Sequence, residues 1–600
     1  MSKPKEDTQG FDGRLLRRIV RYLAPYKWWV LAAFVLTAGA SFLGPLRPRL
    51  VQEAIDSYIV PGDLEGLQGI VLLLVGALVG EGIFSLMQGY LTQWIGQNAI
   101  YDLRTKVFRH IQRQPLRFFD RTPVGRLITR TTSDVEALSD VLSAGVVVIL
   151  GNLFRIAFIL YFMFSLNWVL ALVVLAVMPA MAYGVFQFRR KVRVQYRETR
   201  KQVARLNSFL QEHISGMHIV QAFNREREEM KRFSGINHEH RAAQIKTIFY
   251  FALFWPMVDI VASTALGLVI WFGGLQAMAG TLTIGVLIAF IQFSRQFFEP
   301  IRNLSDQYNT LQSAMAGAER IFGLLDEDAS LAEKETPVVL DRVQGRIEFR
   351  NVWFSYRPED ENGERETDWI LRDVSFVVEP GQQVAIVGAT GAGKTTIINT
   401  LLRFYDIQRG GIFIDGVDIR DLRLAELRRR VGLVLQDVFL FSGSISHNLT
   451  LNDPGITEAD MRRASELVGA DAFIRKLPDG YGQDVRERGA SLSHGQRQLL
   501  SFVRALVYDP EFLVLDEATS SVDTETERLI ELALEKLMAG RTSLVVAHRL
   551  STIQHSDRIL VMHKGQIREQ GAHQELLAMD GLYRRLYELQ YAEQEGQQAA

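Results

Sequence analysis

The chain has 600 residues, of which 48% are hydrophobic, and a formal net charge of −1. At about 150 residues per domain this length allows several domains with ample core, and the near-zero net charge gives no reason to propose a nucleic acid as partner. The sequence contains no cysteine, which excludes disulfides, thiolate catalysis and cysteine-ligated metal sites and fits a reducing cytosol.

Composition divides the chain into two parts. Residues from about 25 to 305 are dominated by long apolar runs, whereas residues from about 345 to 590 alternate short strands, glycine turns and charged helices. The first pattern predicts an α-helical transmembrane bundle, and the second predicts a soluble α/β domain that follows it.

The N-terminal segment, residues 1–24, places Arg14, Arg17, Arg18 and Arg21 among apolar residues. This pattern favours an amphipathic helix that lies on a membrane surface, and we expect no removable signal peptide here. A solvated basic tail is the alternative, because the apolar face is short.

Apolar stretches of membrane-spanning length follow, and each is close to the ~20 residues that a bilayer core requires. Six such spans are predicted, at about 27–46, 68–91, 139–163, 167–187, 247–272 and 283–304. The turn between the third and fourth spans and the turn between the fifth and sixth contain no Lys or Arg. The segment between the second and third spans is basic, with Arg104, Lys106, Arg109, Arg113, Arg117, Arg121, Arg126 and Arg130, and the segment between the fourth and fifth is similar.

The positive-inside rule therefore predicts that both long segments and both termini of a multi-pass membrane protein are cytoplasmic. We expect the membrane to be the bacterial inner membrane. Both segments continue the helical pattern of their neighbouring spans, so we expect long cytoplasmic helical extensions. A break is predicted at each tip, at Phe118–Gly125, where Pro123 and Gly125 interrupt the helix, and near Gly216–Arg225. Short helices at these tips would dock onto the soluble domain, unless the tips are only solvated loops.

Four ionisable residues lie inside the predicted spans: Glu81, Arg155, Asp259 and Arg295. Each would cost about 2.5 to 3.5 kcal/mol if it faced lipid, so we expect them to face one another or a wet cavity. Contact with a transported substrate and purely structural pairing are equally compatible with the sequence.

The soluble part contains a phosphate-binding loop between the apolar run Val384–Val387 and a helix-like stretch that begins at Thr396. Strand, glycine loop and helix in this order surround a polyphosphate with backbone N–H groups, while Lys394 reaches phosphate oxygens and Thr395 reaches Mg²⁺. The residues expected around ATP here are Gly388, Thr390, Gly391, Ala392, Gly393, Lys394, Thr395 and Thr396. The soluble part is thus predicted to be an α/β P-loop NTPase domain.

A second nucleotide element is the apolar strand Phe512–Leu515, which ends in Asp516 and Glu517. The Asp516 carboxylate can hold the Mg²⁺ that bridges the phosphates of ATP. Glu517 is then placed to orient and deprotonate the attacking water.

A further segment, Ala490-Ser-Leu-Ser493-His494-Gly495-Gln496-Arg497-Gln498, lies between these two elements. With the glycine loop, the Asp516–Glu517 strand, Gln436, the Ser521–Asp523 turn and His548, it closely resembles the nucleotide-binding domain of ATP-binding cassette (ABC) proteins. The six spans and the Phe118–Gly125 tip look like an ABC exporter half-transporter, and the resemblance extends from about residue 12 to 590. It implies an N-terminal helix at 1–24, a transmembrane domain at 25–320, a linker at 321–343, a cassette at 344–584 and a flexible tail at 585–600.

The resemblance also implies roles for individual residues. Tyr356 is similar to the aromatic residue that stacks on adenine, Gln436 to the glutamine that senses Mg²⁺ and the attacking water, and His548 to the histidine that binds the γ-phosphate. The implied catalytic set is Lys394, Gln436, Glu517 and His548, the implied metal set is Thr395, Gln436 and Asp516, and the nucleotide contacts extend to Ser493, Gly495, Gln496 and Asp523.

In this family the Ser493 segment completes the ATP site of a second cassette, so a working unit needs two chains. The usual motif Leu-Ser-Gly-Gly-Gln is altered here, because His494 stands at its first glycine. Since such changes are often found in heterodimers with one impaired site, the resemblance favours a heterodimer in which this chain supplies the intact catalytic residues. A homodimer that tolerates His494 is the alternative.

The resemblance implies an ATP-driven exporter that moves amphipathic small molecules, lipids or peptides across the bilayer by alternating access, with ATP and Mg²⁺ as cofactors. Three alternatives stand beside it: a lipid flippase, a membrane channel or receptor gated by ATP, and a soluble cassette ATPase acting on nucleic acid or ribosomes. The six spans argue against the soluble ATPase. An importer is disfavoured because import systems usually separate membrane and cassette chains.

Overall fold

The computed structural model describes residues 13–327, 331, 333–340, 343–357, 368–516, 524–547 and 550–589. The chain forms two units, which are treated separately below. Unit 1 comprises residues 1–112 and 124–328, and unit 2 comprises residues 113–123 and 329–600.

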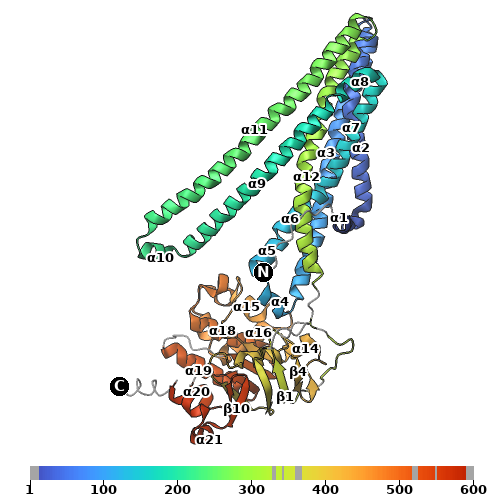
Figure 1. Ribbon diagram of the computed structural model, residues 1–600. Coiled ribbons are helices and arrows are strands. Elements are labelled where there is room, and N and C mark those ends of the chain that lie inside the picture. Colours follow the sequence, from blue (N-terminus) through green and yellow to red (C-terminus); the bar gives the residue numbers. More distant parts are fainter. Residues whose placement is uncertain are drawn as a thin grey trace. The chain divides into compact units, whose positions relative to one another are not determined.

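Unit 1 is helical. Its helices are α1 (Gly13–Arg21), α2 (Lys27–Glu53), α3 (Leu64–Gln112), α5 (Val124–Thr131), α6 (Ser133–Asp140), α7 (Val146–Leu166), α8 (Trp168–Leu175), α9 (Met178–Ser215), α10 (Met217–Ala222), α11 (Glu226–Met278) and α12 (Ile284–Leu325). A π-helical turn at Ala54–Ile59 extends α2, and another at Val141–Gly145 precedes α7. Helices α9 and α11 run side by side and are joined at one end by α10 (Figure 1).

Five helical segments among the described residues are long and apolar enough to cross a membrane: Ala24–Ile59, Leu64–Gln112, Val147–Leu166, Trp168–Ser215 and Glu226–Met278. They contain the apolar cores of the first five predicted spans. The sixth predicted span, 283–304, begins at the N-cap residue Thr283 and continues in the helix α12, which is not among these five. The third span begins later than predicted, because a π-helical turn separates α6 from α7.

The short turns between spans are held by side-chain caps. Asn167 begins α8 and accepts hydrogen bonds from the backbone N–H groups of Val169 and Leu170, both at 3.0 Å. At the start of α12, the Asp56 carboxylate accepts from the Gly285 N–H at 2.9 Å and from the Thr283 hydroxyl at 2.6 Å. These caps satisfy N–H groups that a helix start otherwise leaves without partners.

The first predicted tip differs from the structure in one respect. Gly125 does not interrupt a helix but lies inside α5, where a Cβ would meet nothing within 4 Å. Glycine in a helix costs only about 1 kcal/mol relative to alanine, whereas proline cannot donate the backbone hydrogen bond, so the break falls at Thr122 and Pro123. The second predicted break is present, because α9 ends at Ser215 and α10 begins at Met217.

The N-terminal helix α1 packs on the end of α12 within unit 1. Arg18 donates two hydrogen bonds to the Asp326 carboxylate, at 2.5 and 2.6 Å, and its guanidinium lies 4.3 Å from the centre of the Phe322 ring. Ile19 is buried. The apolar face of this helix is therefore used in part for packing against α12.

Unit 2 contains two sheets. Its strands are β1 (Ile347–Phe354), β2 (Leu371–Val378), β3 (Gln383–Val387), β4 (Arg409–Ile414), β5 (Val417–Asp418), β6 (Val431–Val434), β7 (Phe512–Asp516), β8 (Thr542–Val546), β9 (Arg558–His563) and β10 (Gln566–Gly571). The first sheet is antiparallel in the order β2-β1-β4-β5. The second has the order β10-β9-β3-β8-β7-β6 and is parallel apart from the edge strand β10.

Unit 2 also contains ten α-helices among its described residues. They are α4 (Leu116–Arg121), α13 (Lys394–Leu401), α14 (Leu424–Arg429), α15 (Ile445–Thr450), α16 (Glu458–Leu467), α17 (Asp471–Ile474), α18 (His494–Val507), α19 (Thr524–Met538), α20 (Leu550–Gln554) and α21 (His573–Ala578). Strands β7 and β8 are buried along their whole length, as expected for parallel strands covered on both faces.

The parallel sheet brings the ends of three strands to one edge. β3 ends at Val387, immediately before the glycine loop, and in the pairing of β7 with β8 Asp516 lies opposite Val546. Because the carboxyl ends of parallel strands share an edge, loops from strands distant in sequence meet there. The phosphate loop and Asp516 thus lie at one edge of this sheet.

Candidate nucleotide-binding site

The phosphate loop has a backbone that only glycine adopts without strain at three positions, Gly388, Gly391 and Gly393. Gly388 has φ +150°, and a Cβ there would lie 2.3 Å from the carbonyl oxygen of Met562. Gly393 has φ +102° directly before α13, and a Cβ there would lie 3.1 Å from the Ile370 carbonyl oxygen. The loop therefore curls tightly against neighbouring backbone and leads into a helix N-terminus, which favours anion binding.

Lys394 lies across this loop. Its Nζ donates hydrogen bonds to the carbonyl oxygens of Gly388, at 2.7 Å, and Ala389, at 3.2 Å. Burial lowers the pKa of Lys394, and the negative charge of Asp516 opposes that effect. The ammonium group is thus held inside the loop and near the carboxylate that ends β7.

Thr395 and Thr396 have different surroundings. Thr395 is exposed, so its hydroxyl is accessible for a metal or phosphate contact, whereas Thr396 is buried and its hydroxyl lies 3.2 Å from that of Tyr356. Tyr356 also accepts a hydrogen bond from the Asn399 side chain at 3.3 Å. The predicted adenine-stacking residue is therefore anchored to the helix that follows the phosphate loop.

A second tyrosine, Tyr405, packs edge-on against Tyr356, with ring centres 5.0 Å apart and ring planes at 90°. Its hydroxyl donates a hydrogen bond to the Asp120 carboxylate, from the piece of unit 2 that precedes α5 in sequence. Burial raises the pKa of Tyr405, and Asp120 raises it further. The sequence analysis did not single out Tyr405 or Asp120 as site residues. The position of Tyr405, an aromatic residue shortly after the phosphate-loop helix, was the one signal in the sequence that could have indicated this contact.

Asp516 ends the buried strand β7 and is itself buried, with 7% of its surface exposed. Gln436 follows β6, which pairs with β7 through Val434 and Leu515, and its side chain is exposed. These two predicted residues lie at the same strand edge as the phosphate loop. Glu517, Asp523 and His548 lie outside the described residues.

The predicted metal set consists of oxygen ligands. Thr395 offers a hydroxyl, Asp516 a carboxylate and Gln436 an amide oxygen, which are the ligand types that Mg²⁺ prefers. Within the described ranges there is no group of three or more His, Cys, Asp and Glu residues that could hold a metal. These three oxygens thus fit an ion that takes its remaining ligands from phosphate and water.

The Ser493 segment forms the start of α18. The Ser493 hydroxyl oxygen accepts from the Gln496 N–H at 3.3 Å, and the Gln496 side-chain oxygen accepts from the Ser493 N–H at 3.0 Å. This reciprocal cap leaves the hydroxyl hydrogen of Ser493 available to donate outward. Ser493 and His494 are both exposed, whereas Gly495 is buried.

Comparison with known protein families decides the assignment. Residues 30–301 match the family model of the ABC transporter transmembrane region, and residues 371–520 match the ABC transporter family model. The chain belongs to the ABC transporter family. Both parts lie on one polypeptide, which is the organisation of an exporter half-transporter.

Relatives of this ABC transporter match along nearly the whole chain. The uncharacterized ABC transporter ATP-binding protein YknV of Bacillus subtilis is 38% identical over 97% of this chain and 95% of its own length. The ATP-dependent lipid A-core flippase of Syntrophus aciditrophicus is 36% identical over 98% and 97%. The probable multidrug resistance protein YheH of Bacillus subtilis is 38% identical over 92% of this chain and 81% of its own.

This ABC transporter is therefore a multi-pass integral membrane protein that binds ATP and couples ATP hydrolysis to export. As a half-transporter, it functions in a dimer. A soluble ATPase and an ATP-gated channel are not favoured.

Two of the four intramembrane ionisable residues form ion pairs with partners that the sequence analysis did not single out. Arg47 Nε lies 3.2 Å from Glu81 Oε2, and Arg155 lies 3.7 Å from the Glu299 carboxylate. Gly44 lies between them, since a Cβ there would be 2.9 Å from Glu81 and 3.9 Å from Arg155. The pairs thus link α2, α3, α7 and α12 of the transporter and lower the cost of burying charge.

Proposed function

We propose that two chains of this type clamp ATP between their cassettes, and that closure of the cassettes turns the membrane helices from inward-facing to outward-facing. One observation carries this proposal: the Lys394 side chain is hydrogen-bonded within its own phosphate loop, whereas Ser493 caps an exposed helix start with its hydroxyl oxygen and does not use its hydroxyl hydrogen in that cap. Such a donor suits the γ-phosphate held by a second cassette.

On the phosphate-loop side, different residues of one cassette would bind the nucleotide, hold the metal and catalyse hydrolysis. Tyr356 would stack on adenine, Lys394 would bind phosphate oxygens, and Thr395, Gln436 and Asp516 would hold Mg²⁺, which supplies neutralising charge at the phosphates when bound. Glu517 would deprotonate the attacking water, His548 would bind the γ-phosphate, and Asp523 would close the site. ATP drives the cycle because it binds the closed dimer more tightly than the open one.

The α9–α11 hairpin supports pairing with a second chain. Its joining helix α10 and the adjacent turn expose apolar side chains, including Ile219 at 54% and Phe223 at 73%. Exposed apolar residues at the end of a long arm are typical of a docking surface. We propose that this end contacts the cassette of the partner chain.

The identity of the partner depends on His494. His494 is the first residue of α18 and has no positive φ, so the histidine adds a side chain without backbone strain. The proposal of a heterodimer then depends on the size of the His494 imidazole ring, which would stand close to the γ-phosphate bound by the second cassette. Mass measurement of the chain purified alone tests it, since a self-paired particle with ATPase activity would establish the homodimer.

The cargo proposed is an amphipathic molecule, because relatives are named as a lipid A-core flippase and a probable multidrug resistance transporter. We place the protein in the bacterial inner membrane with cassette, N-terminus and C-terminus in the cytoplasm, on the basic segments between the predicted spans. A nucleic acid is not proposed as partner.

Reconstituted inverted vesicles test the function. The parent is expected to concentrate a fluorescent amphiphile in the lumen when ATP is added, and Glu517→Gln is expected to bind ATP without hydrolysing it or moving the amphiphile. Hydrolysis at the parental rate in that variant would remove Glu517 as the base. ATP hydrolysis without redistribution of any amphiphile would contradict the proposed cargo class.

A further inference from the structure

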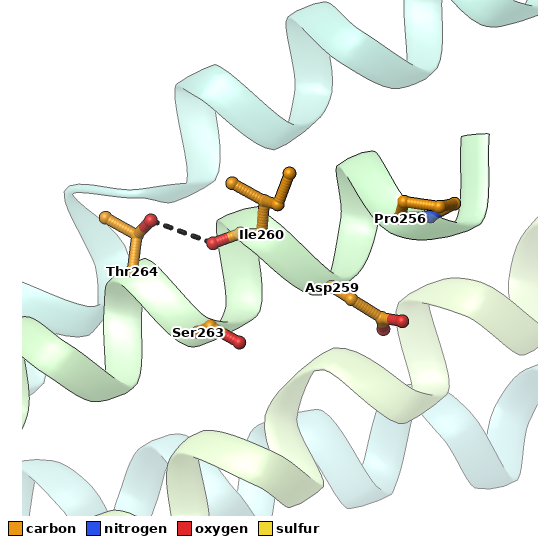
Figure 2. A pocket seen from close by; sticks show the side chains of 5 residues that line it. All are labelled: Pro256, Asp259, Ile260, Ser263 and Thr264. Carbon is orange, nitrogen blue, oxygen red and sulfur yellow. Dashed lines mark hydrogen bonds between the residues drawn. The ribbon is translucent and has the colours of Figure 1, made fainter. Parts of the chain in front are cut away.

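Two groups of residues outside the phosphate loop differ in how many segments they join. On α11, the residues around a surface hollow all belong to that one helix, and the Thr264 hydroxyl donates to the Ile260 carbonyl of the same helix at 2.8 Å (Figure 2). These residues are Pro256, Asp259, Ile260, Ser263 and Thr264. In the cassette, by contrast, Arg504 of α18 and Asn448 of α15 are bonded to each other and to the irregular segment 435–443. The second group can therefore fix one part of the cassette against another.

Arg504 lies in the last turn of α18 and donates hydrogen bonds to two other segments. Its Nε donates to the Asn448 carbonyl oxygen at 2.8 Å, and its Nη2 donates to Asn448 Oδ1 at 3.4 Å. Its Nη1 donates to the Phe439 carbonyl oxygen at 3.1 Å. Burial lowers the pKa of Arg504, and among the described residues no carboxylate pairs with it. Its charge is thus met by carbonyl and amide oxygens.

Asn448 extends this cluster into the cassette core. Its side chain is fully buried, its Nδ2 donates to the carbonyl oxygens of Phe441 at 2.8 Å and Ser444 at 3.2 Å, and its Oδ1 accepts from the Phe441 N–H at 2.8 Å. A buried polar group with all its partners in place favours one arrangement of the chain around it. Arg504 and Asn448 therefore hold the segment 435–443 at Phe439 and Phe441.

This segment depends on side chains because it has no regular structure of its own. Residues 435–443 form neither helix nor strand between β6 and α15. Backbone groups in such a segment need partners from elsewhere. Helix α18 is held independently, since its Leu499, Leu500 and Val503 are buried in the cassette core. Loss of the Arg504 bonds would therefore release the segment and leave α18 in place.

Gln436 stands at the start of the released part, three residues before Phe439. Its side chain is exposed, and among the described residues it makes no hydrogen bond. Nothing in this cassette thus fixes the Gln436 amide directly, and its position is set by the backbone that leads to Phe439. Residues that orient a metal ligand in this way typically change metal affinity or activity about 10- to 100-fold when they are replaced.

We propose that Arg504 is a positioning residue of the ATP site, which holds the segment that presents Gln436 to the metal. This inference rests on the proposed function, in which Gln436 binds Mg²⁺, and adds a residue of α18 that touches neither metal nor nucleotide. Arg504 acts through the backbone at Phe439, and Asn448 supports the same segment at Phe441.

Hydrogen exchange of the full-length protein without nucleotide tests the first step. Arg504→Met keeps an apolar side chain and removes the donors. Exchange in peptides that cover residues 437–444 is expected to accelerate about ten-fold or more, while exchange in the first turns of α18 stays at the parental rate.

Nucleotide titration tests the second step. The ratio of the affinity for the ATP analogue AMP-PNP with Mg²⁺ to its affinity in EDTA is measured for the parent, Arg504→Met, Gln436→Ala and the double variant. The ratio is expected to fall about ten-fold in each single variant, with the affinity in EDTA unchanged. The double variant is expected to fall no further, because both changes remove the same contact.

Arg428→Met is the matched control. Arg428 also donates to two backbone carbonyl oxygens of the cassette, those of Leu402 at 3.3 Å and Arg403 at 3.1 Å, and burial lowers its pKa as well. A loss of melting temperature is expected in both arginine variants, but only Arg504→Met should change exchange in 437–444 and the affinity ratio. If Arg504→Met does not fold, Arg504→Lys, which can bond only one of the two segments at a time, is expected to lower the ratio about three-fold.

Three results would overturn the proposal: parental exchange in 437–444, a parental affinity ratio in the arginine variant while Gln436→Ala lowers it, or a double variant in which the two effects add. Failure of the proposed role of Gln436 gives a different result. The ratio would then be unchanged in Gln436→Ala itself, which would remove Gln436 as a metal ligand and this inference with it.

Discussion

The phosphate loop and the Ser493 segment are both helix starts in the same cassette, yet their surroundings differ. At the phosphate loop, Lys394 is buried and bonded to two carbonyl groups of its own loop. At α18, Ser493 and His494 are exposed, and the cap involves only Gln496. One half of the site is thus shaped by contacts within its own chain, and the other is an exposed helix start, as the proposed contact with a second cassette requires.

This difference predicts different consequences of mutation. A residue of the phosphate-loop half should affect nucleotide binding by a single cassette. A residue of the Ser493 half should affect hydrolysis, because the proposed site is complete only when two cassettes close. Measuring ATP binding and ATP hydrolysis for the same variant therefore separates the two halves.

The largest effect is expected for Lys394→Ala. The change removes the cation proposed to bind phosphate oxygens, and the loss of one such donor typically lowers turnover about 100-fold or more. Both ATP affinity and ATPase rate should fall, as measured by nucleotide titration and phosphate release. Lys536→Ala, on the exposed end of α19, is the control. Parental ATP affinity in Lys394→Ala would contradict its role.

A smaller and more selective effect is expected for Ser493→Ala. Loss of a hydrogen bond to charged phosphate costs about 1.5 to 3 kcal/mol, or roughly ten- to 100-fold in ATPase rate, while ATP binding by one cassette should persist. Ser444→Ala is the matched control, because Ser444 also caps a helix of this cassette by accepting from a backbone N–H, that of His447 at 3.0 Å.

Both variants lose a helix cap worth about 1 kcal/mol, so comparable changes in melting temperature are expected. Only Ser493→Ala should lose hydrolysis out of proportion to stability. If the two variants lose ATPase activity equally, Ser493 acts only as a cap, and the proposed contact with a second cassette is removed.

Tyr405 connects the phosphate-loop half to α4, because its ring packs on Tyr356 and its hydroxyl donates to Asp120. The variant Tyr405→Phe tests this connection. The ring that packs on Tyr356 is kept, but the hydroxyl that donates to Asp120 is lost, which leaves a carboxylate without its donor. Hydrogen exchange in α4 should accelerate by an amount that corresponds to about 1 to 3 kcal/mol, with ATP affinity little changed.

Tyr481→Phe is the control for this effect, since Tyr481 donates a similar hydrogen bond to Asp471 at 2.8 Å elsewhere in unit 2. Burial raises the pKa of Tyr481 to about 12, so its hydroxyl is also protonated at neutral pH. Exchange in α4 should not change in this variant. Equal exchange of α4 in both variants would show that Asp120 is held by other contacts.

Local sequence was sufficient to predict the strand, glycine loop and helix. Gly388 to Gly393 lies between β3 and α13, and Asp516 ends the parallel strand β7, as the order of residues indicated. The roles of these residues toward ATP stay predictions. The cap formed by Ser493 and Gln496 was not predicted, although its Ser-x-x-Gln spacing is a readable capping signal.

Contacts between distant segments could not be predicted in the same way. Arg47 and Glu299 pair with residues on other helices, and their partners depend on helix rotation, which the sequence pattern leaves open. The Tyr405–Asp120 hydrogen bond joins residues 285 positions apart. Gly125 was wrongly placed at a break, because glycine permits a turn but does not require one.

The smallest effect is expected for His573→Gln, a change that tests how the stability of the cassette depends on pH. It separates a pH effect on folding from a pH effect on ATP hydrolysis. His573 is buried, and its Nδ1 lies 2.6 Å from the Tyr583 hydroxyl; burial lowers its pKa. In the unfolded chain His573 has its ordinary pKa near 6.5. At pH values between that pKa and the lowered pKa of the folded state, the unfolded chain binds more protons than the folded chain. The free energy of unfolding is therefore fully retained above about pH 6.5 and falls as pH falls below it. His573→Gln should therefore flatten the decline of melting temperature below about pH 6.5. If ATPase activity of that variant still falls with pH as in the parent, the pH effect belongs to the site and not to the fold.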